Sequence, residues 1–163
     1  MRYIKTFNEN AENLKEELLD FCESNLAYLL DEAKLQVVPN PGGWSELHLI
    51  KIMLDEPKHW DEIKDYMIPF LTRLVAKYEI SQPFHKDPFT STSGSDKKDT
   101  KSVEDKRLYI LFSEKLHPSY IQIKDLIEDK DTPNARISYM FFYVKGYKAE
   151  NKSFLTKIKS FFK

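Results

Sequence analysis

The longest strand-like run in the chain spans residues 135–147, with the sequence ARISYMFFYVKGY. β-branched and aromatic residues are enriched in strands, and Gly146 gives the run an end. Because both faces of the run are largely apolar, it predicts a central strand that is covered on both sides, or nearly so. Alternation divides its side chains into one face with Ile137, Tyr139, Phe141, Tyr143 and Lys145, and another with Ser138, Met140, Phe142 and Val144.

An amphipathic helix is predicted over residues 10–33, because apolar residues recur there at helical spacing. Asn8 or Asn10 is the predicted N-cap, and acidic residues follow in the first turn, where the helix dipole favours anions. Residues 1–7 are predicted to be a short strand, or a lead-in whose Phe7 packs against the helix. The apolar stripe of the helix consists of Leu14, Leu18, Phe21, Cys22, Leu26, Leu29 and Ala33.

A hairpin is predicted over residues 35–53. Its strands, 35–38 and 44–53, are joined by the turn PNPGG, in which the prolines fix φ and the glycines permit a positive φ.

A second amphipathic helix follows the hairpin. Asp55 is its predicted cap, and Pro57 lies in the first turn, where its missing N–H costs nothing. Pro69 predicts a kink near residues 65–69 within this one helix. The apolar stripe consists of Trp60, Ile63, Met67, Phe70, Leu71, Leu74 and Tyr78.

Residues 83–106 differ from the rest, because Ser, Thr, Lys and Asp dominate and no apolar periodicity remains. Such a composition predicts a mobile loop. Beyond it, residues 107–112 predict a strand, 119–123 a short extended piece and 124–130 a single helical turn before the central strand.

The chain ends in a predicted basic amphipathic helix. We expect its phenylalanine face to close the sheet, and its lysines to lie outward. The apolar side holds Phe154, Ile158, Phe161 and Phe162, and the lysines are Lys152, Lys157, Lys159 and Lys163.

These elements predict an α+β fold: a mostly antiparallel sheet of about four strands, with two long amphipathic helices on one face and a short C-terminal helix. We expect one domain overall, made of a helix–hairpin–helix half (1–82), the loop (83–106) and a strand-rich half that carries the C-terminal basic helix (107–163).

Charge is balanced overall but not locally. The net charge of the chain is -1, so no global field attracts nucleic acid or membrane. Residues 8–33, however, carry eight acidic side chains against one Lys, and residues 145–163 carry six Lys against one Glu. The chain is therefore acidic near its start and basic near its end.

Candidate chemistry is sparse. Cys22, the single cysteine, fits a reducing compartment, and its place on the apolar stripe favours a buried structural thiol over a nucleophile. The histidines, His48, His59, His85 and His117, have no metal-ligand spacing, and the carboxylates decorate helix faces or flank turns. We therefore expect no catalytic residue, cofactor or metal site, and no enzymatic activity.

Two binding roles remain to be weighed. Arg136 and Lys145 flank the aromatic central strand, as in sheets that stack nucleic-acid bases, but the spacing of an RNA-recognition strand is absent. The basic tail has the lysines and phenylalanines of an interfacial anchor, but it spans only about three turns. A core strand and a docked tail are the favoured interpretations, and nucleic acid and membrane are disfavoured as partners.

The opening MRYIKTFNE, the patterning of residues 35–80 and the Ile- and Tyr-rich run 135–147 with its VKG resemble small uncharacterised proteins encoded by tailed bacteriophages. The resemblance implies a viral origin, with the host cytoplasm or the virion as the location, and it assigns no site residue.

We therefore expect a non-enzymatic binding protein that acts by protein–protein contact in the infected cell, as an inhibitor or adaptor. The alternatives are a structural component of the phage particle and a nucleic-acid-binding module. The expected partner is an acidic protein, and the oligomeric state is left open. The candidate interaction residues are Lys157, Lys159, Lys163, Phe162 and Trp44.

Overall fold

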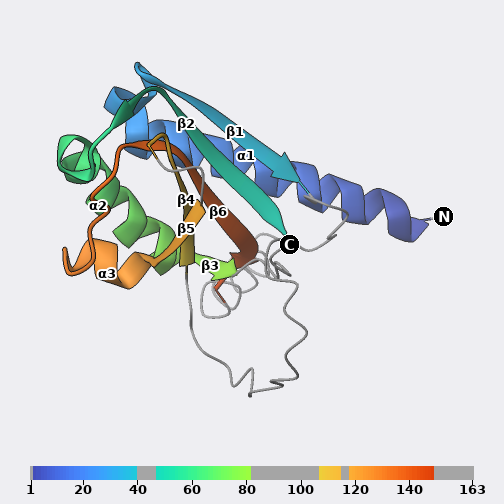
Figure 1. Cartoon of the computed structure of the whole chain (residues 1–163). Helices are drawn as coiled ribbons and strands as arrows, with labels where there is room; N and C mark the ends of the chain where they lie inside the picture. Colours follow the sequence, from blue (N-terminus) through green and yellow to red (C-terminus); the bar gives the residue numbers. More distant parts are fainter. Residues whose placement is uncertain (1, 40–46, 82–106, 115–117, 149–163) are drawn as a thin grey trace, which may run out of the picture.

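Six strands form one antiparallel sheet in the computed structural model of the protein (Figure 1). The structure describes residues 2–39, 47–81, 107–114 and 118–148. The strand order is β1-β2-β6-β4-β5, and β3 also pairs with β6. The strands are β1 (Ala33–Pro39), β2 (His48–Lys58), β3 (Tyr78–Ser81), β4 (Arg107–Phe112), β5 (Pro118–Gln122) and β6 (Ile137–Tyr147).

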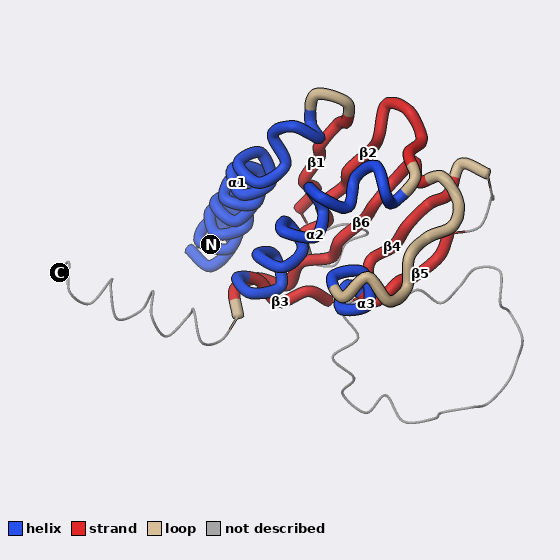
Figure 2. The backbone as a smooth tube through the Cα atoms, turned by 90° about the vertical axis from the view of Figure 1, so that its left-hand side faces the viewer, coloured by secondary structure: helices blue, strands red, loops and turns tan. Residues whose placement is uncertain are grey.

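Three helices accompany the sheet: α1 (Arg2–Leu30), α2 (Trp60–Lys77) and α3 (Ile123–Ile127). They lie on the same side of the strands (Figure 2). Their buried side chains join those of the sheet in one core. At its centre, the rings of Phe70 on α2 and Phe142 on β6 meet edge to face, with centroids 5.8 Å apart. This layered arrangement confirms the α+β class, with a larger sheet than the predicted four strands.

The predicted central strand is confirmed as β6, which pairs with β2 along one edge and with β4 and β3 along the other. Met140, Phe142 and Val144 are fully buried against the helices. The opposite face is not fully covered, because Tyr139 there is 36% exposed. Gly146 does not end the strand either. It pairs with Glu79 beside a bulge in β6, where Lys145 is the extra residue, and it has a φ of 143°, which glycine adopts at little cost.

β3 and β4 lie in line along one edge of β6. Ser81 in β3 pairs with Tyr143 of β6. Tyr109 in β4 pairs with Phe141, which lies two residues nearer the start of β6. β2 also pairs with Tyr143, so β3 must occupy the other edge, which it shares with β4. The two strands therefore act as one interrupted strand. The chain leaves the sheet after Ser81 and returns at the place where β3 would have continued.

The first helix is longer than predicted. It begins at Arg2, so the strand or lead-in over residues 1–7 and the caps at Asn8 and Asn10 are wrong. The segment contains no proline or glycine, and Tyr3 and Phe7 extend the helical spacing of the apolar residues, which allows the helix to continue. Leu26 has non-helical dihedrals (φ -121°, ψ 18°), which mark a kink close to the end of α1 at Leu30.

The boundary between the hairpin and the second helix is also displaced. The hairpin of β1 and β2 is confirmed, but β2 runs on to Lys58 through the predicted cap, Asp55, and through Pro57. The backbone N–H of Asp55 donates to the carbonyl of Glu32 (2.9 Å), and Lys58 pairs with Ile137 and forms an ion pair with Glu32. These contacts hold the segment extended across a bulge.

The second helix, α2, therefore begins later, at Trp60. Its predicted apolar stripe is buried through Leu74, while Tyr78 is buried at the start of β3. Pro69 lies inside this single helix, as expected, and the kink there stays a prediction.

The strand over 107–112 is confirmed as β4, and the extended piece and helical turn correspond to β5 and α3, each beginning one residue early. β3 was not predicted, because four residues following a helix carry too little periodicity. The loop over 83–106, Trp44 and the C-terminal helix lie outside the described residues.

The interrupted strand makes a testable prediction. Replacement of residues 82–106 by a link of about four Gly and Ser residues should leave cooperative unfolding intact, since Ser81 and β4 end and begin at neighbouring positions. The shorter loop should stabilise the fold by about 1.5 kcal/mol, which raises the melting temperature by a few degrees. Thermal unfolding followed by circular dichroism measures this shift.

A control deletion should also remove β3, residues 78–81. Because Tyr78 is fully buried, we expect this longer deletion to lower the melting temperature sharply or to abolish the transition. Loss of cooperative unfolding in the first variant would contradict the in-line arrangement of β3 and β4.

Candidate functional site

Cys22 is a structural residue, as its place on the apolar stripe predicts. Its side chain is fully buried on the inner side of α1. Burial, with a smaller contribution from the charge of Glu23, raises the pKa of the thiol to about 12. The thiolate required for nucleophilic chemistry is therefore almost absent at neutral pH.

The two described histidines are far apart. His48 begins β2 and is buried, whereas His59 is exposed just beyond the other end of that strand. Ten residues of β2 lie between them, and at the rise of an extended chain they place the two histidines roughly 35 Å apart. Within the described parts of the chain, no group of three or more His, Cys, Asp or Glu side chains could hold a metal ion. His85 and His117 lie outside these parts.

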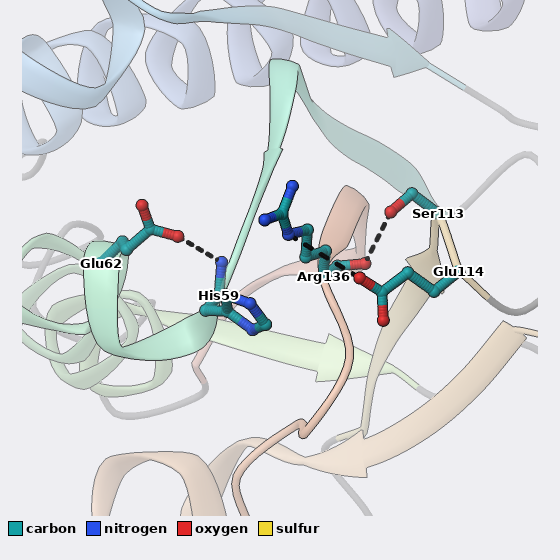
Figure 3. A network of polar contacts seen from close by, with 5 residues as sticks. All are labelled: His59, Glu62, Ser113, Glu114 and Arg136. Carbon is teal, nitrogen blue, oxygen red and sulfur yellow. Dashed lines mark hydrogen bonds and ion pairs between the residues drawn. The ribbon is translucent and has the colours of Figure 1, made fainter.

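A cluster of polar groups near the start of β6 serves the fold (Figure 3). The N–H and Oγ of Ser113 both donate to the carbonyl of Arg136, at 3.0 and 3.3 Å, and Arg136 Nε lies 3.7 Å from Glu114 Oε1. These contacts tie the end of β4 to the entry of β6. On the neighbouring helix, the backbone N–H of His59 donates to Glu62 Oε2 (2.7 Å), which caps α2.

The sheet surface opposite the helices is the most distinctive candidate site, and we call it the open face. Cross-strand pairing places its side chains together, because paired residues point to the same side of a sheet. The described side chains on this face include Lys34, Gln36, Val38, Leu49, Lys51, Met53, Ser81, Leu111, Tyr120, Gln122, Tyr139, Phe141 and Tyr143.

Aromatic rings occupy the middle of the open face. The rings of Tyr139 and Phe141 are stacked, with centroids 6.2 Å apart and an interplanar angle of 14°. Tyr139 and Tyr120 are 36% and 38% exposed. Partial burial raises the pKa of the Tyr143 hydroxyl, and a smaller contribution comes from Tyr120, which places these two phenols near each other. The centre is therefore apolar, with phenol groups at its surface.

Positive charge borders these rings on the β1 and β2 side. Lys51 Nζ lies 6.0 Å from the centroid of the Phe141 ring, and Lys34 is exposed on the edge strand. Neither lysine forms an ion pair with a described residue. Near the other end of β6, Lys145 lies 3.9 Å from Glu79, which offsets its charge.

The predicted interaction residues cannot be placed beside this surface. Lys157, Lys159, Lys163, Phe162 and Trp44 all lie outside the described residues. The sequence did contain the signal for the open face, since alternation assigned Tyr139, Phe141 and Tyr143 to one side of β6. The expectation that both sides would be covered concealed it.

The state of Cys22 can be tested with a thiol reagent. In the folded protein at pH 8, Cys22 should not react with a soluble aromatic disulfide over minutes, because its pKa of about 12 leaves too little thiolate and its side chain is buried. In guanidinium chloride the same thiol should react fully, with a pKa near the ordinary value of about 8.5. Rapid stoichiometric reaction without denaturant would contradict the structural role.

None of the described helices is long and apolar enough to cross a membrane. Comparisons of this chain with protein-family models, with curated proteins and with solved structures find no match. No residue role is therefore transferred from another protein.

Proposed function

We propose that this protein is a non-enzymatic binding protein that holds an acidic protein partner against its open face. The observation that carries the proposal is the row of partly exposed aromatic side chains on the central strand β6 and on the edge strand β5. Tyrosine is among the residue types enriched at energetically important interface positions.

The sheet provides a pre-organised surface for such a partner. Tyr139 and Phe141 belong to β6, which is held by strands on both edges, so little conformational entropy is lost when they are covered. Their stacked rings present a flat apolar area, and the hydroxyl of Tyr139 can exchange a water for a hydrogen bond to the partner.

The charge of the partner follows from the lysines. Lys34 and Lys51 lie beside the aromatic centre without a carboxylate partner among the described residues. An acidic surface would therefore be attracted to them, and no ion pair with a described residue would have to break. Charges at the rim of an interface mainly increase the rate and specificity of association. An acidic protein that also presents apolar side chains therefore fits both parts of the open face.

The phage resemblance supports the same role in an infected cell, as an inhibitor or adaptor. A structural protein of the particle would use similar contacts, and its presence in purified virions by mass spectrometry would distinguish that role. A single-stranded nucleic acid would also be attracted by stacked aromatics and lysines. In that role, this protein would bind oligonucleotides with an affinity that depends steeply on salt. Binding of a protein partner does not require such a dependence.

The test combines two substitutions on the open face, Tyr139→Thr and Lys51→Glu. Threonine keeps a β-branched residue in the central strand, and both positions reach solvent, so the melting temperature should change little. Affinity for the partner should fall at least tenfold for Tyr139→Thr, which corresponds to about 1.4 kcal/mol. Affinity capture from infected cells with quantitative mass spectrometry, followed by titration of the recovered partner, measures this loss.

A matched control is available on the helical side. Tyr28 and Tyr66 are 78% and 43% exposed, and their rings lie 6.1 Å apart, so they resemble Tyr139 in type and exposure. Tyr66→Thr should leave binding unchanged. A partner that is lost with Tyr66→Thr and retained with the open-face variants would overturn the proposal and move the interaction surface to the helices.

A further inference from the structure

A groove lies where the middle of α1 meets the end of α2. Its volume is about 380 Å³. The ring of Phe21 gives it an apolar wall that is fixed to the core, with centroids 5.9 Å from Phe70 and 5.4 Å from Tyr78. The lining residues are Glu17, Asp20, Phe21, Ser24 and Asn25 from α1 and Lys77 from α2.

Two carboxylates of α1 line this groove, Glu17 and Asp20. Both residues are exposed, and neither forms an ion pair with a described residue. Glu17 also contributes, after burial, to the raised pKa of the nearby Tyr78 hydroxyl. Negative charge therefore lies beside the Phe21 wall.

The described chain ends at this groove. The backbone N–H of Lys148 donates to the carbonyl of Lys77 (3.3 Å), and the ring of Tyr147 lies 5.3 Å from that of Tyr78. Residues 149–163 must therefore start beside the groove wall. They contain four lysines against one glutamate, and Phe154, Ile158 and Phe161 recur at helical spacing.

The length of residues 149–163 as a helix fits the length of α1 available to it. A helix of the fifteen residues 149–163 would be about 22 Å long. From Phe21 back to Arg2, α1 continues for about 28 Å, and its N-terminal part extends beyond the strands (Figure 1). Leu14, one to two turns before the groove, is partly buried and adds an apolar position along that path.

We propose that residues 149–163 dock on α1 of the same chain, with Phe154, Ile158 and Phe161 over the Phe21 wall and Leu14, and with lysines beside Glu17 and Asp20. The open face is the competing site within the molecule. It carries Lys34 and Lys51, so it would repel a lysine-rich segment, whereas Glu17 and Asp20 on α1 form no ion pair with any residue that the structure describes. The acidic surface that the basic tail fits is therefore the first helix of its own chain.

The test uses a nitroxide label on the full chain at Ser160→Cys, with mass spectrometry to verify one label per molecule. In a dilute sample, amide signals of residues 12–21 in α1 should lose intensity through paramagnetic relaxation, and those of residues 139–143 in β6 should not. Loss confined to β6 would place the tail on the open face, and no loss in either region would show a tail without a docking site. Both outcomes overturn the proposal.

Charge reversal makes the test specific. Lys157→Glu with Lys159→Glu should restore the α1 signals. Addition of Glu17→Lys with Asp20→Lys should bring back the signal loss, because opposite charges again face each other. These positions on α1 are exposed, so folding should be retained. Signal loss only when labelled chain is mixed with isotope-labelled, spin-free chain would show docking on a second copy, which overturns the intramolecular arrangement.

Discussion

The edge-to-face contact between Phe70 and Phe142 requires that β6 is paired along both of its edges. The rest of the fold depends on the same constraint. β2 pairs along one edge, and β4 with β3 along the other. Only when all three strands are in place does β6 present a continuous row of buried side chains to α2. The last strand in the described chain therefore organises elements that precede it by up to about ninety residues.

This arrangement makes the two surfaces of the sheet unequal. The helices cover one surface and complete a core in which Trp60, Phe70 and Tyr78 are almost fully buried. The other surface keeps aromatic side chains that alternate with the buried ones, since a strand cannot place two successive residues on one side. Exposed rings at the centre of the sheet follow from an aromatic sequence combined with helices on one side only. They are tolerated where a contact with another molecule can use them.

Long periodic segments were predictable from sequence, whereas boundaries were not. The stripe from Trp60 to Leu74 and the alternation of residues 137–145 fixed a buried helix and a central strand without any tertiary information. The start of α2 depended instead on distant partners of Lys58, namely Ile137 and Glu32, which no local pattern contains. The cap at Asp55 was chemically reasonable, but tertiary pairing determined its conformation. For the same reason the open face emerged only once the helices had been placed.

The interruption between β3 and β4 also divides the chain into two pieces that need each other. The piece that ends at Ser81 supplies α1, α2 and the strands β1, β2 and β3, of which β2 and β3 pair with β6, but it does not supply β6 itself. The piece that begins at Arg107 supplies β6 with β4, β5 and α3, and it lacks the two helices that bury its inner face. Each piece alone would expose apolar surface and unpaired strand edges that the other covers. The fold is thus suited to fragment complementation, with a break at this point and reassembly through the sheet itself.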